Sequence, residues 1–275
     1  MSGFLDDAFA EAERRVTKWR RDGFLSALRH EPASRAPGSS FTEALRSCGS
    51  IALIAEIKRA SPLRGSLAGD VDVASRARLY VEAGAAAVSV LTESQWFGGS
   101  IDDLGAARRL VQAPLLRKDF IVDEYDLEVS AVAGADAVLL IAARFEVGRL
   151  RNLLLFAREL GLDVLVETHD DGDAAVACEA GAEIIGVNSR NLRTLQVDVN
   201  GALRALRRLP PDRVKVLESG IGSPCDIQSA IESGANAVLV GELLMRSSDP
   251  AATIRLLLAR SDAANRLRAV RNGSD

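Results

Sequence analysis

The chain has 275 residues, of which 48% are hydrophobic and 26% are charged, close to the averages for globular domains, so global disorder is excluded. Lys and Arg total 34 against 38 Asp and Glu, a formal net charge of −4, which argues against partners such as nucleic acid or anionic membranes. The composition favours a compact, soluble enzyme and leaves its chemistry open.

Metal centres, disulfides and membrane segments are not expected. The 3 cysteines are far apart and none stands in a C-x-x-C pair, and His30 and His169 are the only histidines. The longest apolar run, residues 137–143, is far shorter than the roughly 20 residues of a membrane helix. The N-terminus mixes acidic and basic residues and has no apolar secretory core, so we expect a cytoplasmic protein.

Residues 1–48 are predicted to form a helical extension. Phe9, Val16 and Trp19 belong to an apolar stripe at helical spacing, and a short helix is expected near 41–45. The segment is too short for a second domain, so we expect it to pack on the rest of the chain.

A Gly-Ala pair opens an apolar run at four places, and these recur about every 50 residues. The glycines are Gly84, Gly134, Gly181 and Gly234. Each follows an amphipathic stretch, so we expect it to end a helix in the left-handed conformation. The apolar run after each pair is predicted to be a strand buried on both faces, which is typical of parallel sheets.

Four more apolar runs lie between these strands, at 51–57, 114–116, 162–166 and 213–217. Eight strands that alternate with helices predict an α/β protein with a parallel sheet. An open doubly wound sheet is the alternative, but the first strand lacks a G-x-G-x-x-G turn, and the regular spacing favours a (β/α)₈ TIM barrel. We place the barrel at residues 49–260 and a polar tail at 261–275.

Polar residues close most of the predicted strands. In this fold the active site lies at the carboxyl ends of the strands, so these side chains are expected to gather at one mouth. Glu56 and Lys58 are two residues apart and are predicted to share a face. Lysines beside carboxylates are suited to proton transfer. The candidates are Glu56, Lys58, Lys118, Glu167, Asn188, Arg190, Glu218 and Ser219.

A phosphate site is predicted after the last two strands. Gly220 and Gly241 would let backbone N–H groups approach an anion, and Lys58 and Arg190 would add charge. Glu242 is expected to contribute its N–H group while its carboxylate turns outward. A side chain at Gly241 is therefore expected to weaken substrate binding more than it slows the reaction.

Several segments together resemble the indole-3-glycerol phosphate synthase family. They are IAEIKRASP at 54–62, LRKDFI at 116–121, LVETH at 165–169, GVNSRNL at 186–192, ESGI at 218–221 and VGELLMR at 240–246. The resemblance spans about residues 4–258. It implies ring closure of 1-(2-carboxyphenylamino)-1-deoxyribulose 5-phosphate to indole-3-glycerol phosphate with loss of CO₂ and water, without a metal or organic cofactor.

The resemblance also implies roles for individual residues. Lys118 would be the acid in ring closure, Lys58 the acid in dehydration and Glu167 the base, with Glu56 assisting, although the two lysines remain interchangeable. The remaining residues would bind substrate or its phosphate. They are Asn188, Arg190, Glu218, Ser219, Phe120 and Ser61 for the substrate, and Lys58, Arg190, Gly220, Gly241 and Glu242 for the phosphate.

Three other functions are alternatives to this one. Lys118 could form a Schiff base in a class I aldolase-type barrel. Phosphoribosylanthranilate isomerase chemistry prefers a Cys/Asp pair, whereas the first strand offers Glu56 and Lys58. A non-catalytic phosphate-binding barrel would show gaps in the polar set, and the strand ends show none. The expected partner is a phosphorylated small molecule, and the expected state is a monomer or weak homo-oligomer.

Overall fold

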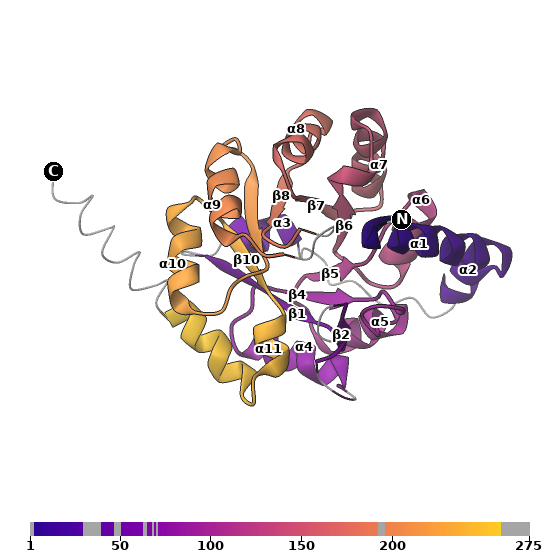
Figure 1. Cartoon of the computed structure of the whole chain (residues 1–275). Coiled ribbons are helices and arrows are strands. Elements are labelled where there is room, and N and C mark those ends of the chain that lie inside the picture. The colour runs from indigo at the N-terminus through magenta and orange to yellow at the C-terminus, as the bar shows by residue number, and fades with distance from the viewer. Residues whose placement is uncertain are drawn as a thin grey trace.

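The computed structural model describes residues 3–29, 40–46, 51–62, 65–67, 69, 71–191 and 196–259. Eight parallel strands close into a barrel in the order β1-β10-β9-β8-β7-β6-β5-β4, which confirms the predicted TIM barrel (Figure 1). The strands are β1 (Ala52–Ile57), β4 (Ala87–Leu91), β5 (Leu115–Lys118), β6 (Ala137–Ile141), β7 (Asp163–Thr168), β8 (Ile184–Asn188), β9 (Val214–Glu218) and β10 (Ala237–Val240).

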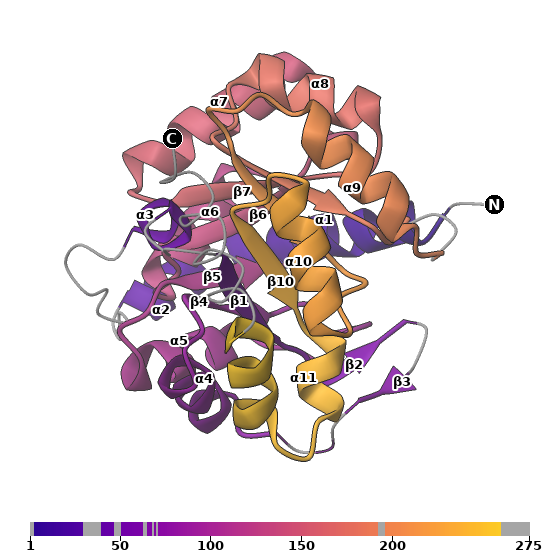
Figure 2. The ribbon, with the colours of Figure 1, turned by 90° about the vertical axis from the view of Figure 1, so that its left-hand side faces the viewer.

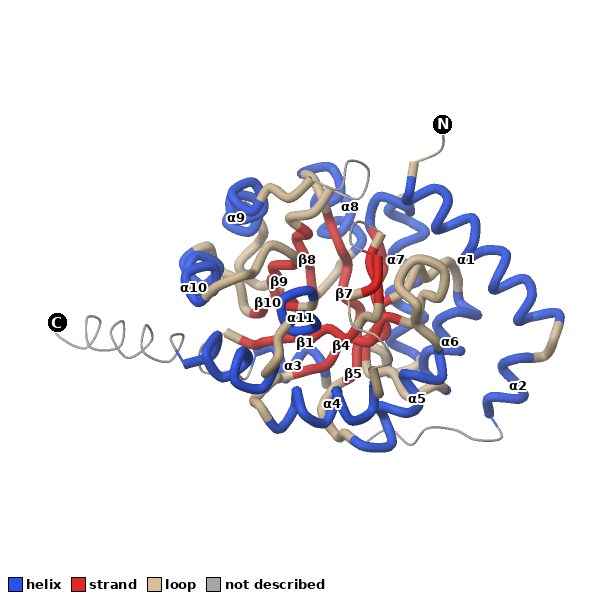
Figure 3. The backbone as a smooth tube through the Cα atoms, turned by 60° about the horizontal axis from the view of Figure 1, so that its bottom comes forward, coloured by secondary structure: helices blue, strands red, loops and turns tan. Residues whose placement is uncertain are grey.

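Helices surround the strands, as Figure 3 shows with strands in red inside helices in blue. They are α4 (Val73–Glu82), α5 (Ile101–Leu110), α6 (Glu124–Val132), the 3₁₀ turn η1 (Ala142–Arg144), α7 (Val147–Glu159), α8 (Asp171–Ala180), α9 (Val199–Arg208), α10 (Pro224–Glu232) and α11 (Glu242–Arg246). Residues 250–259 are also helical. Among these described helices, none is both long and apolar enough to cross a membrane.

The repeated glycines take the conformation that the sequence predicted. Gly84, Gly134, Gly181 and Gly234 have φ of 109°, 93°, 91° and 83°, in the left-handed region that side chains with a Cβ disfavour. Each reverses the chain from an outer helix into the next buried strand. The repeat therefore marks one helix-to-strand turn in every second βα unit.

The N-terminal segment contributes three described helices, α1 (Phe4–Arg21), α2 (Phe24–Arg29) and α3 (Phe41–Arg46). Helix α1 packs beside α6, and its Phe9 ring contacts the rings of Phe120 after β5 and Phe145 after β6. Helix α3 lies at the opposite end of the barrel from the two-stranded ribbon β2 (Ala60–Ser61) and β3 (Gly65–Ser66), as Figure 2 shows. The predicted tail at 261–275 lies outside the described residues.

The core has two layers. Side chains inside the barrel, such as Ile54, Leu116 and Leu165, form one buried cluster, which α1 and α3 extend with Phe9 and Phe41. A larger cluster fills the space between the strands and the outer helices. Because α3 fills one end of the barrel, the carboxyl ends of the strands are left to form the site.

Candidate active site

A cavity of about 490 Å³ opens at the carboxyl ends of the strands. The structure brings most of the predicted site residues onto its wall. These are Glu56, Lys58, Ser61, Lys118, Asn188, Arg190, Glu218, Ser219, Gly220, Gly241 and Glu242. Parallel strands of one barrel end at the same rim, so residues up to 186 positions apart in the chain meet here.

Glu56 and Lys58 lie on the same face of β1, as their spacing predicted. Lys58 Nζ donates to Glu56 Oε1 at 2.5 Å, and the Glu56 side chain is 4% exposed. Gly241 lies directly against this pair. A Cβ at Gly241 would be 2.3 Å from Glu56 Oε1 and 3.0 Å from Lys58 Nζ. A side chain at Gly241 would therefore have to displace both charged groups, so we expect it to slow the reaction as well as to weaken binding, and the earlier expectation stays a prediction to be tested.

Lys118 occupies the centre of the barrel mouth between two buried carboxyl groups. Its Nζ lies 3.1 Å from Glu167 Oε2 and 3.5 Å from Glu218 Oε2. Burial opposes the charge on Lys118, but attraction to Glu167 and Glu218 outweighs burial and raises the pKa of the lysine. The Lys118 ammonium therefore keeps its charge at neutral pH.

The two carboxyl groups beside Lys118 differ in their affinity for protons. Burial alone would raise the pKa of Glu167, but Lys118 and His169 lower it well below its usual range. Burial and repulsion from Glu167 raise the pKa of Glu218 to about 8. Environments that push two pKa values apart are typical of paired acid and base groups. These opposite shifts favour an ionised Glu167 and a protonated Glu218 at neutral pH.

Two predicted site residues do not line the cavity. The Glu167 side chain is 1% exposed and lies beneath Lys118, so it reaches the cavity through that lysine. Phe120 is buried in an aromatic cluster and contacts Phe4 and Phe97, which do line the cavity. Phe120 therefore supports the wall of the cavity.

The backbone after β9 and β10 has the close turns expected of an anion site. Ser219 and Gly220 have φ of 66° and 76°, and Gly241 precedes α11. The Glu242 carboxylate lies 3.9 Å from Arg190 Nη2 and 3.8 Å from Arg246 Nη1. Arg246 also lines the cavity and was not singled out from the sequence.

His169 is a second residue that sequence reasoning missed. Its Nε2 lies 3.2 Å from Glu167 Oε1, and its Nδ1 lies 3.6 Å from Asp173 Oδ2. Burial lowers the pKa of His169, but Asp173 and Glu167 outweigh burial and raise it to about 10. Its position two residues after Glu167, directly after the end of β7, was the available signal, because a spacing of two keeps side chains on the same side of an extended backbone.

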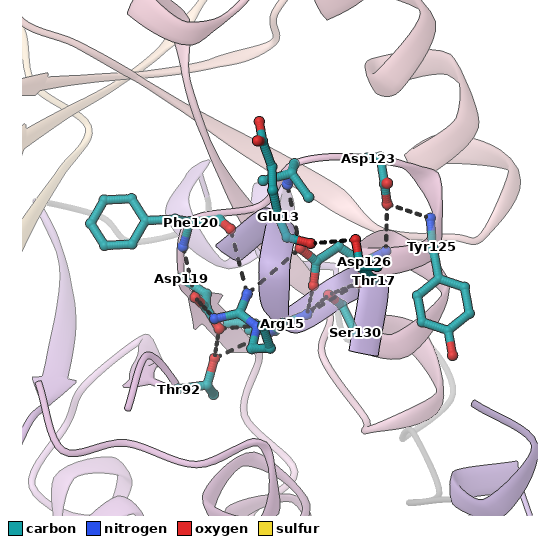
Figure 4. Close-up of polar contacts among 12 residues, drawn as sticks. Glu13, Arg15, Thr17, Thr92, Asp119, Phe120, Asp123, Tyr125, Asp126 and Ser130 are labelled. Carbon is teal, nitrogen blue, oxygen red and sulfur yellow. Dashed lines mark hydrogen bonds and ion pairs between the residues drawn. The ribbon is translucent and has the colours of Figure 1, made fainter. Parts of the chain in front are cut away.

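A buried ion network anchors α1 behind the strand that carries Lys118 (Figure 4). Arg117 Nη2 donates to Asp119 Oδ2 at 2.8 Å, and its Nη1 lies 3.1 Å from Asp126 Oδ1. From helix α1, Arg15 donates through Nη1 to Asp119 Oδ1 at 2.9 Å, and Arg15 Nη2 lies 3.6 Å from Asp126 Oδ2. Thr92 donates to Asp119 Oδ2 at 2.6 Å. Across the described residues, no group of three or more His, Cys, Asp or Glu is arranged to hold a metal ion.

Solved structures share the fold at low sequence identity. The chain is similar to thiamine phosphate pyrophosphorylase from Pyrococcus furiosus, with a TM-score of 0.61 and 15% identity over 82% of this chain and 98% of that one. It is also similar to 3-hexulose-6-phosphate synthase from Salmonella typhimurium, with a TM-score of 0.61 and 17% identity over 75% of this chain and 96% of that one. At such identities these matches establish the barrel fold alone.

Sequence comparisons are more specific. The family model for indole-3-glycerol phosphate synthase matches residues 5–257. Indole-3-glycerol phosphate synthase 2 of Streptomyces coelicolor is 45% identical over 94% of this chain and 100% of its own length. Indole-3-glycerol phosphate synthase of Nocardioides sp. is 46% identical over 91% of this chain and 96% of its own length. The chain belongs to the indole-3-glycerol phosphate synthase family.

Proposed function

We propose that the chain closes 1-(2-carboxyphenylamino)-1-deoxyribulose 5-phosphate to indole-3-glycerol phosphate, releasing CO₂ and water. The observation that carries this proposal is the arrangement around Lys118, where one buried ammonium lies 3.1 Å from Glu167 and 3.5 Å from Glu218. Ring closure followed by dehydration needs two acids and a base. Two lysines and three carboxyl groups supply them at the barrel mouth.

Lys118 gives a proton to the ribulose carbonyl oxygen as the carboxylated ring carbon attacks the carbonyl carbon. Loss of CO₂ returns the bonding electrons to the ring. Lys58 then protonates the departing hydroxyl. As water leaves, Glu167 acts as the base and receives a proton from the intermediate through Lys118, which lies between Glu167 and the cavity. Glu56 holds Lys58 in place through their 2.5 Å hydrogen bond. Positioned acids and bases of this kind are worth about 10²- to 10⁴-fold each.

The rest of the cavity wall binds the substrate. We assign the hydroxyl groups and the anthranilate carboxylate to Ser61, Asn188, Arg190, Glu218 and Ser219. A protonated Glu218 donates a hydrogen bond to a carboxylate, which an ionised one repels. The phosphate lies against the backbone of Gly220, Gly241 and Glu242, with Lys58 and Arg190 supplying positive charge.

The direct test adds synthesised substrate to the purified chain and follows indole fluorescence and CO₂ release. We expect both signals to rise in equal molar amounts. Binding without product would favour a non-catalytic phosphate-binding barrel. No binding and no product would exclude both functions.

A class I aldolase-type mechanism makes a different prediction. A Schiff base needs a neutral amine, whereas Glu167 and Glu218 raise the pKa of Lys118 and keep it charged. Borohydride treatment with substrate is therefore expected to leave every lysine unmodified by mass spectrometry. A covalent adduct on Lys118 would replace the proton-transfer mechanism.

We also propose that the chain acts in the cytoplasm on its phosphorylated substrate as a monomer or weak homo-oligomer. The near-neutral net charge of −4 and the 26% of charged residues are compatible with this. Sedimentation across a range of protein concentrations tests the oligomeric state. A concentration-independent dimer would overturn that part of the proposal.

A further inference from the structure

His169 lies between the carboxylates of Glu167 and Asp173, and it approaches the Glu167 oxygen that does not face Lys118. Strand β7 ends at Thr168, α8 begins at Asp171, and His169 occupies the short connection. The backbone N–H of His169 donates to Asp173 Oδ2 at 2.9 Å, and its Nδ1 lies 3.6 Å from the same oxygen. Its Nε2 lies 3.2 Å from Glu167 Oε1. Asp173, His169, Glu167 and Lys118 thus form a continuous chain of alternating charge.

We propose that His169, held by Asp173, is a positioning residue that keeps Glu167 ionised and directed at Lys118. The proposal rests on the function proposed above, in which Glu167 is the base. His169 does not line the cavity, and its side chain is 11% exposed. It therefore acts through Glu167 and does not touch the substrate.

The charges around Glu167 explain why a second cation is needed. Lys118 approaches from β5, Glu218 from β9 and Glu56 from β1, so three carboxyl groups surround one central ammonium. The Lys118 charge is shared between Glu167 and Glu218, and buried like charges favour protonation of one member of such a pair. An imidazolium at Glu167 Oε1 stabilises the ionised form of Glu167 and leaves the proton on Glu218.

Asp173 determines the protonation state of His169. Burial alone favours neutral imidazole, and the two flanking carboxylates reverse this preference, raising the pKa of His169 to about 10. Removing one carboxylate therefore returns the pKa of His169 toward its usual value near 6.5. The chain of contacts then loses its second cation at a lower pH than in the wild-type protein, with no change to any residue on the cavity wall.

The experiment measures the protonation of His169 directly. Because the sequence has only two histidines, labelled-histidine NMR in a His30→Gln background reports on His169 alone. We expect His169 to remain charged through pH 8 and to titrate more than one unit lower in the Asp173→Asn variant. Asp171→Asn removes a 74% exposed carboxylate from the same helix and is the matched control, with no shift of that size expected.

Kinetics then tests the positioning role. His169→Leu is expected to lower kcat by about 10- to 100-fold with little change in KM, because it weakens the base and leaves the binding wall intact. In Asp173→Asn, kcat should fall with rising pH at the same midpoint as the His169 titration. A neutral His169 in the wild-type protein at pH 7, or a kcat that both variants leave unchanged, would overturn the proposal.

The two proposals fail in different ways. NMR titration needs no turnover, so a wild-type protein that makes no indole product refutes the proposed function while the charge of His169 is still measured. A wild-type protein that makes product and contains a neutral His169 refutes only the role proposed for His169.

Discussion

Arg15 of helix α1 lies 2.9 Å from Asp119, the residue that follows Lys118 in the chain. The contact joins residues 104 positions apart, and Asp119 is 1% exposed (Figure 4). Arg117 and Arg15 bind the same carboxylate from the strand and from the helix. Burial alone would raise the pKa of Asp119, but the two guanidinium groups lower it to about 2. The N-terminal helix is thus fixed to the strand that carries the proposed acid.

Arg15→Met is expected to lower the free energy of unfolding by roughly 2 kcal/mol. This loss is smaller than the cost of leaving a buried charge without any partner, because Arg117 still pairs with the carboxylates of Asp119 and Asp126. Urea denaturation measures this change. Arg14→Met is the matched control, since its ion pair with Glu11 is exposed, and we expect less than about 1 kcal/mol. Equal losses in the two variants would contradict an anchoring role for Arg15.

Lys118→Ala should lower kcat by about 100-fold or more, because it removes a positioned acid. It also leaves Glu167 and Glu218 without the ammonium between them. Indole fluorescence under saturating substrate gives kcat, and the exposed Lys18→Ala on α1 is the control for loss of a lysine. Turnover near the wild-type value would exclude Lys118 as the acid.

Glu218→Gln tests the protonated carboxyl group. With a pKa of about 8, Glu218 carries its proton below that pH and loses it as the pH rises further. We expect the KM of the wild-type protein to increase above pH 8, because an ionised Glu218 repels the substrate carboxylate. The glutamine variant cannot ionise, so its KM should stay level across this range. A parallel rise in both proteins would assign the pH dependence to another group.

Gly241→Ala is expected to lower kcat and to raise KM together. The new Cβ would be 2.3 Å from Glu56 Oε1, so it displaces the Glu56–Lys58 pair as well as narrowing the phosphate site. Gly222→Ala provides a comparison, because its Cβ would meet no atom closer than Asp226 Oδ2 at 3.9 Å. Steady-state kinetics separates the two constants. If Gly241→Ala changed KM alone, the Glu56–Lys58 pair would have moved aside without any loss of turnover.

The barrel was predictable because its signals are local and repeated. Gly84 and Gly134 each end a helix in the left-handed region, and the runs after them are buried strands. The polar strand ends were predictable for a related reason, since a closed parallel barrel brings its carboxyl ends to one rim. The barrel fold and the polar residues at its rim can therefore both be predicted from local sequence patterns.

Other features depend on contacts between distant segments. No periodic pattern indicates that Arg15 meets Asp119, or that Phe120 packs against Phe4 and leaves the cavity wall to its neighbours. The protonation of Glu218 depends on its burial and on its distance from Glu167, and neither is encoded by its neighbours in sequence. Such properties arise only when the barrel has closed and α1 has docked.

Strand β5 gives neighbouring residues opposite surroundings. Lys118 faces the cavity, while Arg117 and Asp119 are buried in the network with α1. Successive side chains of a strand point to opposite faces, so a one-residue insertion or deletion in β5 would exchange these environments. The Lys118 ammonium would then lie in the ion network with α1, and the Arg117 guanidinium or the Asp119 carboxylate would lie in the cavity. Single substitutions in β5 can therefore be tolerated one position at a time, whereas an insertion or deletion of one residue would exchange the buried network and the cavity wall.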